Sequence, residues 1–216
     1  MRFANDQQRM SIVGATGSGK THAAMWHLSR RSYDTKPWIV YDFKTDELIN
    51  SVPGATHLRV DSPVPERPGL YIVHPHPADG DYVEAQMWSI WQRGNVGVYI
   101  DEGYMVGKNN HAFRALLTQG RSKHVPMIVL SQRPVWMDRF VFSESEFFQI
   151  FRLQHKKDVA SVQEFIPHDL SKRLPEYHSY YYDVGADKMV VLGPVPKQQE
   201  ILRTFAFKLQ KLTKVV

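Results

Sequence analysis

Short runs of apolar residues alternate along the chain with longer stretches in which apolar residues recur at helical spacing. Strands are predicted over residues 10–13, 38–42, 70–73, 96–100, 127–130 and 148–153, with a short edge strand over 58–60. Helices are predicted between them, over residues 21–31, 81–93, 111–119 and 158–165. Strands that alternate with helices indicate an α/β fold, in which helices cover both faces of a mainly parallel sheet.

The C-terminal part of the chain has a different pattern. Two strands over residues 180–184 and 188–192 flank the turn 185–187, which predicts a hairpin. A basic amphipathic helix follows over residues 197–214. We therefore expect a single domain over residues 1–216, with a core over about 8–165 and an antiparallel hairpin and helix extension over 166–216.

A glycine-rich segment joins the first predicted strand to the first predicted helix. It matches the pattern G-x-x-x-x-G-K-[ST], and its residues are Gly14, Ala15, Thr16, Gly17, Ser18, Gly19, Lys20 and Thr21. Glycines let backbone N–H groups turn toward phosphate oxygens, and the helix adds its positive N-terminal end. In this motif Lys20 reaches the β and γ phosphates and Thr21 binds Mg²⁺. The segment predicts a site for ATP and Mg²⁺, and its context disfavours a plain glycine turn with a solvated lysine.

Two adjacent carboxylates, Asp101 and Glu102, follow the apolar run over residues 96–100. In P-loop enzymes a carboxylate at this place holds the magnesium shell, and a second one can activate the attacking water. We assign Asp101, with Thr21, to magnesium and Glu102 to water activation. The alternative is a solvated turn, because adjacent acids are common at strand ends. The pair favours hydrolysis of ATP over transfer of its phosphate to a small acceptor.

A polar segment, Ser131-Gln132-Arg133, follows the next predicted strand. Parallel strands deliver such residues to the carboxyl edge of the sheet, where ligands of open α/β sheets bind. The amide of Gln132 can donate to a γ-phosphate and accept from the attacking water, so we predict that it senses the γ-phosphate. The alternative is a polar cap of the strand.

Four short segments follow the glycine loop in a recognisable order: 41–44 (YDFK), 99–102 (YIDE), 120–126 (GRSKHVP) and 130–134 (LSQRP). This order resembles the FtsK–HerA superfamily of DNA-pumping ATPases over about residues 8–165. The superfamily has an Asp-Pro-Lys-like strand end, and an arginine-bearing segment before a strand that ends in Thr-Gln-Arg-Pro. Here Phe43 replaces the proline and Ser131 replaces the threonine.

The resemblance implies a P-loop NTPase with a RecA-like sheet. In its small size the chain is similar to the genome-packaging ATPases of membrane-containing icosahedral viruses, such as the tectivirus type. The resemblance also implies a homo-oligomeric ring, for which a hexamer is the expected form. This ring is expected to bind double-stranded DNA without sequence preference. The expected role is to package viral DNA into a preformed capsid, with capsid or packaging-vertex proteins as partners. The expected location is the host cytoplasm, or the packaging vertex of the virion.

Ring ATPases complete each site with an arginine from the neighbouring subunit, because a guanidinium offsets the charge that develops on the γ-phosphate. The candidates are Arg121, Arg133 and Arg152. The resemblance points first to Arg121, to which we assign this catalytic role. Arg133 can instead brace the glutamine segment. Arg152, in the strand predicted over 148–153, can pair with a carboxylate.

The charge balance changes this interpretation little. The chain has 27 Lys+Arg against 22 Asp+Glu, and a net charge of +5 permits contact with DNA without requiring it. Candidate phosphate contacts are the loop 103–110, which includes Lys108, and the helical residues Lys208, Lys211 and Lys214. For the helical set, a solvated face or a subunit contact is favoured over contact with DNA.

Composition excludes several other kinds of site. Cysteine is absent, which excludes a disulfide framework and thiolate metal sites, and His74 and His76 lack zinc spacing. No apolar run of 18 residues suggests a membrane span, and the first residues are too polar for a signal peptide, so we expect a cytoplasmic protein. Trp88 and Trp91 lie three apart in a predicted helix, which predicts core packing.

Other functions stay open for a chain with these motifs. Filamentous-phage-type assembly or export ATPases also carry an early P-loop, but they normally have a transmembrane segment. A small P-loop nucleotide kinase would need an arginine-rich lid and an acceptor site. A non-catalytic nucleotide switch is disfavoured by Glu102.

Overall fold

A computed structural model of the protein describes residues 2–107 and 109–213. Within these residues nine strands form one sheet, in the order β3-β4-β2-β5-β6-β1-β7-β8-β9. All neighbouring pairs from β3 to β7 are parallel, whereas β7–β8 and β8–β9 are antiparallel. The mainly parallel sheet with a C-terminal antiparallel extension is therefore confirmed. The strands are β1 (Met10–Val13), β2 (Pro37–Asp42), β3 (Thr56–Leu58), β4 (Gly69–Val73), β5 (Gly97–Asp101), β6 (Met127–Ser131), β7 (Phe147–Ile150), β8 (Ser179–Asp183) and β9 (Lys188–Leu192).

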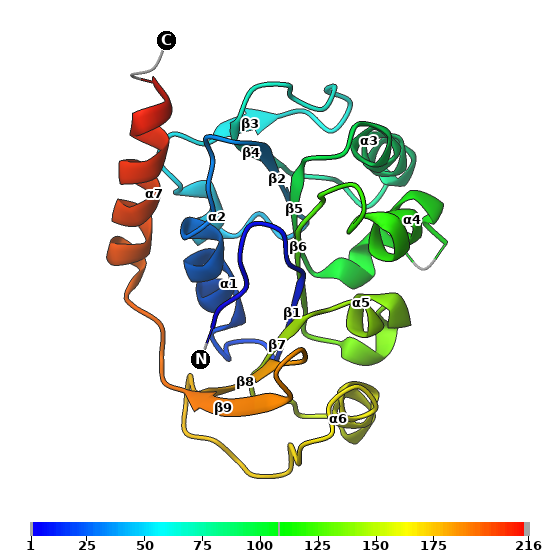
Figure 1. The fold of residues 1–216 in the computed structure, drawn as a ribbon, viewed down its shortest axis with the longest axis vertical. Helices are drawn as coiled ribbons and strands as arrows, with labels where there is room; N and C mark the ends of the chain where they lie inside the picture. Colours follow the sequence, from blue (N-terminus) through cyan, green and yellow to red (C-terminus); the bar gives the residue numbers. More distant parts are fainter. Residues whose placement is uncertain (1, 108, 214–216) are drawn as a thin grey trace.

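Helices cover both faces of the sheet, as Figure 1 shows. One face carries α1 (Lys20–Ser29), α2 (Glu47–Asn50) and α7 (Gln198–Thr213). The other carries α3 (Gly80–Arg93), α4 (His111–Gln119), α5 (Arg139–Ser143) and α6 (Lys156–Gln163). Two short 3₁₀ helices, η1 (Gly103–Val106) and η2 (Pro134–Trp136), follow β5 and β6 at the carboxyl edge.

The two helical layers create two hydrophobic cores, one on each face. Strand β2 contributes to both, because successive side chains in a strand point to opposite faces. Trp38 and Val40 pack in the core that α1 and α7 cover, and Ile39 and Tyr41 pack in the core that α3 and α4 cover. All four are fully buried. Burial on both faces explains why the central strands are continuous apolar runs in the sequence.

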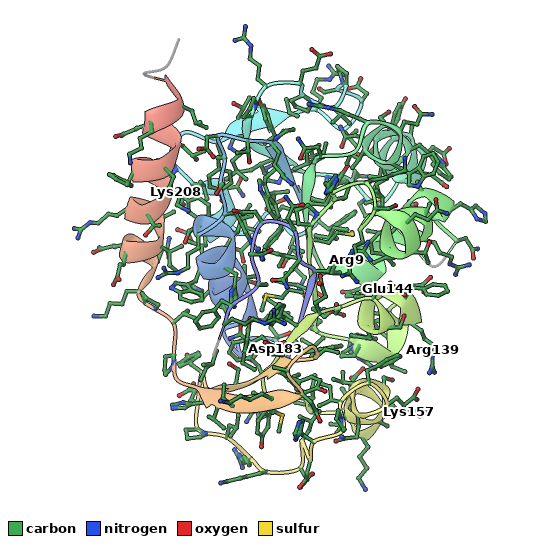
Figure 2. All side chains as sticks on the ribbon, viewed as in Figure 1. Arg9, Arg139, Glu144, Lys157, Asp183 and Lys208 are labelled. Carbon is green, nitrogen blue, oxygen red and sulfur yellow. The ribbon has the colours of Figure 1, made fainter. Side chains whose placement is uncertain are left out.

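Helix α7 returns across the molecule and packs against α1 (Figure 1). Ile201, Phe205 and Leu209 recur every four residues on its buried face. Lys208, labelled in Figure 2, donates a hydrogen bond to Arg31 O at 2.8 Å, so this lysine anchors the helix to the end of α1. Lys211 is exposed, whereas Lys108 and Lys214 lie outside the described residues.

The expected core packing of the tryptophan pair is confirmed for Trp91 and wrong for Trp88. Trp88 is 36% exposed, and it meets Trp91 edge-to-face with ring centroids 5.7 Å apart. The buried face of α3 is formed instead by Val83, Met87 and Ile90. Trp91 is partly buried and packs against this core, whereas Trp88 lies on the outer part of the helix.

Candidate nucleotide-binding site

The glycine loop between β1 and α1 has a backbone shape that its glycines permit. Gly17 and Gly19 have φ angles of 73° and 94°, in the left-handed region that side chains disfavour. A Cβ atom at Gly14 would lie 2.6 Å from both Phe151 Cβ and Ser18 Oγ. A larger residue at Gly14 would therefore push the loop away from β7.

Backbone hydrogen bonds tie this loop to the strands on either side of β1. The N–H of Gly14 donates to Ser131 O at 3.2 Å, and the N–H of Ala15 donates to Arg152 O at 2.9 Å. Helix α1 begins at Lys20, and the N–H groups of its first turn have no helical acceptor. These groups and the positive end of the helix can receive phosphate oxygens.

Asp101 ends β5 with a buried carboxylate that has an unused oxygen. The residue is 1% exposed, and its Oδ1 has no hydrogen-bond partner among the described residues. Burial and the charge of Glu102 raise the pKa of Asp101 to about 7, against the opposing effect of Lys44 and Lys20. A divalent cation fits this oxygen, since it would favour the ionised carboxylate. Thr21 follows Lys20 in the first turn of α1. Its role as a second magnesium ligand stays a prediction.

Glu102 is fully buried at the end of β5, with φ 59° and ψ 66°. Its Oε1 accepts a hydrogen bond from Lys44 Nζ and lies 3.4 Å from Lys20 Nζ. Its Oε2 accepts from the N–H of Gln132 at 3.0 Å. The carboxylate is thus fixed between the glycine loop and the polar end of β6, where a base for the attacking water is needed.

Lys44 is a residue of this site to which the sequence pattern gave no role. Besides its contact with Glu102, its backbone N–H donates to Asp42 Oδ1 at 3.2 Å. Asp42 and Asp101 are register partners in the parallel pair of β2 and β5. The sequence signal for Lys44 was its place in the segment 41–44 after a predicted strand, whereas the neighbouring position of β2 and β5 is known only from the structure.

Gln132 connects the glycine loop to the segment that follows the acidic strand. Its Oε1 accepts a hydrogen bond from Thr16 Oγ1, and its Nε2 donates to the hydroxyl of Tyr104 at 3.3 Å. Together with the bond from its backbone N–H to Glu102, these side-chain bonds join three segments at one residue. A change at the loop can therefore reach η1 through Gln132.

Arg133 braces the segment after β6. Its Nε donates to Asp158 Oδ2 at 3.1 Å, and its guanidinium stacks on the Trp136 ring at 4.2 Å from the centroid. The other oxygen of Asp158 accepts from the N–H of Val135 at 3.1 Å. The bracing role is the one that the geometry supports for Arg133.

Arg152 lies two residues beyond β7, so the predicted strand over 148–153 was too long. No carboxylate of the described residues pairs with its exposed side chain. Instead it lines a cavity of about 340 Å³ together with Gly17 and Ser18. Because Arg152 lies beside the glycine loop of its own chain, its position favours a role within one subunit.

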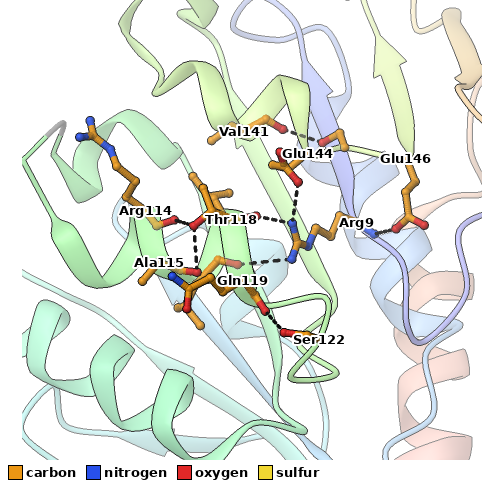
Figure 3. A network of polar contacts seen from close by, with 12 residues as sticks. Arg9, Arg114, Ala115, Thr118, Gln119, Ser122, Val141, Glu144 and Glu146 are labelled. Carbon is orange, nitrogen blue, oxygen red and sulfur yellow. Dashed lines mark hydrogen bonds and ion pairs between the residues drawn. The ribbon is translucent and has the colours of Figure 1, made fainter.

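Arg121 lies at the opposite edge of the sheet from the glycine loop. It precedes β6, whose five residues span about 17 Å before Gln132 is reached. It lines a cavity of about 450 Å³ with Arg9 and Glu144. Figure 3 shows Arg9 between Glu144 and the end of α4, where it donates to Leu117 O. Arg121 cannot reach its own loop, so the predicted catalytic role requires a neighbouring subunit.

The remaining features considered from the sequence are His74, a metal site, a membrane span and the loop 103–110. His74 lies 3.3 Å from Asp42 Oδ2 and 3.3 Å from His57 Nδ1. Over residues 2–107 and 109–213, no group of three or more His, Cys, Asp or Glu is arranged to hold a metal ion. The same residues include no helix that is long and apolar enough to cross a membrane. The first part of the loop 103–110 forms η1.

The sheet, the glycine loop and the carboxylates at its edge define a P-loop ATPase. Over 216 residues the chain is 49% identical to the DNA packaging ATPase P9 of Enterobacteria phage PRD1, and the match covers 95% of each protein. The chain belongs to the family of this DNA packaging ATPase. No protein-family model matches the chain.

Solved structures confirm the fold. The genome packaging NTPase B204 of Sulfolobus turreted icosahedral virus 2, in complex with AMPPCP, superposes with a TM-score of 0.64 at 16% identity. That match covers 89% of this chain and 100% of B204. ATPases 2 and 3 of EssC from Geobacillus thermodenitrificans give a TM-score of 0.64 at 11% identity, over 97% of this chain and 44% of EssC.

Proposed function

We propose that the protein hydrolyses ATP to drive double-stranded viral DNA into a preformed capsid. The observation that carries the proposal is the convergence of Lys20 and Gln132 on Glu102 at the carboxyl edge of the sheet. The family relationship to a DNA packaging ATPase supports DNA as the cargo. The binding of AMPPCP and ATP-γS by B204 proteins supports ATP as the nucleotide.

In this function residues 14–21 bind the triphosphate, and Lys20 contacts its β and γ phosphates. Thr21 and Asp101 hold Mg²⁺, which offsets phosphate charge. Glu102 accepts a proton from the attacking water. Lys20 lies 3.4 Å from Glu102 Oε1, so a γ-phosphate competes with this carboxylate for the ammonium group. Nucleotide binding therefore changes the surroundings of Glu102 before hydrolysis.

Gln132 passes this change to the rest of the protein. Its side chain contacts Thr16 in the glycine loop and Tyr104 in η1, and its backbone contacts Glu102. Arrival or loss of the γ-phosphate shifts the balance of these bonds, and η1 moves with them. The whole chain acts as one ATPase domain, with a core over about residues 8–165 and an extension over 166–216, whose helix α7 packs against α1.

The protein works as a homo-oligomeric ring, by expectation a hexamer, in which Arg121 of one subunit completes the site of the next. The ring grips DNA phosphates without reading bases, which suits a net charge of +5. Its partners are capsid or packaging-vertex proteins, and it acts in the host cytoplasm or at the packaging vertex.

The test is DNA-stimulated ATP turnover by the intact protein. Lys20→Ala and Glu102→Gln each lower turnover at least about 100-fold, the contribution of a positioned catalytic group. Lys20→Ala also loses ATP binding, whereas Glu102→Gln keeps it. The exposed Lys188→Ala and Glu200→Gln are matched controls with unchanged turnover.

Two results would count against the proposal in different ways. Turnover that survives both site substitutions means that the assigned residues are not the catalytic ones. If DNA does not change the rate of ATP turnover in the assembled ring, the protein hydrolyses ATP for another purpose.

A further inference from the structure

A cavity of about 260 Å³ opens beside the first turn of α1. Its walls include Gly19 and His22 from the loop and helix, Phe151 from the end of β7, Tyr177, and the segment 194–197. Tyr177 and the segment 194–197 lie in the C-terminal extension, which the motifs of the P-loop do not reach. The cavity therefore joins the glycine loop to a part of the chain that has no role in the chemistry described above.

The cavity lies on the far side of the glycine loop from the carboxylates. The sheet order β5-β6-β1-β7 puts Asp101 and Glu102 on one side of β1 and Phe151 on the other. Strands β5 and β7 are three spacings apart, about 14 Å. The γ-phosphate end of a triphosphate lies near Lys20 and Glu102, so the nucleoside end must leave the loop on the other side. The cavity is on that side.

We propose that this cavity holds the base of the nucleotide and that Tyr177 is the residue on which the base stacks. The Cδ1 atom of Tyr177 lies 3.2 Å from the Cβ position of Gly19, and Cε1 of Phe151 lies 3.7 Å from it. The two rings thus border the point where the loop becomes helix. Phe151 is 4% exposed and supports the wall, whereas Tyr177 is 48% exposed and has ring surface free to bind.

The chemistry of the cavity favours stacking over reading of the base edge. Pro194 and Pro196 have no backbone N–H, and Val195 between them has an apolar side chain. These three residues offer no side-chain donor or acceptor that could distinguish adenine from guanine, and the polar side chains of the wall are those of His22, Tyr177 and Lys197. Stacking on an aromatic ring tolerates any base, because every base has a π-face. The site therefore takes nucleoside triphosphates without selecting the base, and ATP and GTP bind with similar affinity.

This inference rests on the proposed function, because it presumes that the loop binds a triphosphate. The experiment measures dissociation constants by calorimetry with Mg²⁺ for three probes, AMPPCP, GMPPCP and inorganic tripolyphosphate. Tyr177→Ala weakens both nucleotide analogues roughly 5- to 150-fold, the equivalent of one lost base–aromatic stack. It leaves the affinity for tripolyphosphate unchanged. Tyr177→Phe keeps the ring and the affinity, and Tyr82→Ala, at a 55% exposed tyrosine of α3, is the matched control.

The outcomes separate the base site from the phosphate site. Unchanged nucleotide affinity in Tyr177→Ala overturns the inference, and so does an equal loss for tripolyphosphate, because the ring would then act on the loop itself. A difference of more than about tenfold between the dissociation constants of AMPPCP and GMPPCP overturns the inference that the base is held by stacking without being distinguished. If the unmodified protein binds none of the three probes, the proposed function fails as well.

Discussion

The carboxylate of Glu102 is fully buried, and the ammonium groups of Lys20 and Lys44 neutralise it. Its left-handed backbone, with φ 59°, costs of order 1–3 kcal/mol for a residue with a side chain. The surrounding bonds offset this cost, and they hold the carboxylate at the edge of the sheet. Glu102 is therefore positioned before any nucleotide arrives, and in its proposed role this reduces the reorganisation that hydrolysis requires.

Asp101 is the residue at which stability and function oppose each other. Its buried Oδ1 has no hydrogen-bond partner among the described residues and lies beside a second carboxylate, so we expect Asp101→Asn to stabilise the nucleotide-free protein by about 1–3 kcal/mol. The same change removes a proposed magnesium ligand, so we expect Mg²⁺-dependent ATP turnover to fall. Denaturant unfolding and turnover at varied Mg²⁺ concentration measure the two effects.

The matched control for this prediction is Asp61→Asn. Asp61 is exposed and pairs with Arg59 at 3.0 Å, and an exposed ion pair contributes little to stability. We expect neither stability nor turnover to change in this variant. An Asp101→Asn protein that is less stable than the parent and still responds to Mg²⁺ would contradict the assignment.

Short strands place the residues of the candidate site at the edge of the sheet. The sequence predicts these strands because each one is recognised from a local pattern of apolar and polar residues. A buried strand followed by a polar residue appears at Asp101 and at Gln132, and parallel strands bring both to one edge. The contact of Lys44 with Glu102 was not predictable in this way, since it depends on how far a side chain reaches across the sheet. Tyr177 follows α6 in a segment without periodicity, and only tertiary packing determines its place beside Gly19.

Helix α7 offers a direct test of how the extension is held. Phe205 is fully buried against α1, whereas Phe207 on the same helix is 62% exposed. Phe205→Ala removes a buried ring and leaves a cavity, so we expect a loss of about 3–5 kcal/mol in the free energy of unfolding. Phe207→Ala is the matched control, with a change within about 0.5 kcal/mol. Denaturant unfolding measures both, and equal effects would mean that α7 does not pack as described.

At the scale of the whole molecule, the sheet separates two functional regions. The glycine loop and carboxylates lie at its carboxyl edge, and Arg121 lies at its amino edge beside Arg9. Head-to-tail packing of identical subunits brings opposite surfaces into contact and closes into a ring when the rotation permits. Such packing is the arrangement that the proposed role of Arg121 requires, because no motion within one chain spans the sheet.

Mixed rings test this arrangement. Arg121→Ala alone lowers ATP turnover about 1000-fold or more, the contribution of an arginine finger, and Lys20→Ala alone abolishes it. In an equal mixture, an Arg121→Ala subunit that receives the intact arginine of a Lys20→Ala neighbour has a complete site. Random head-to-tail assembly completes about a quarter of all sites, so turnover returns to that fraction of the parent value. Arg152→Ala is the control, because Arg152 lies beside its own loop and a neighbour cannot replace it. A mixture no more active than its components would exclude Arg121 as the residue that acts between subunits.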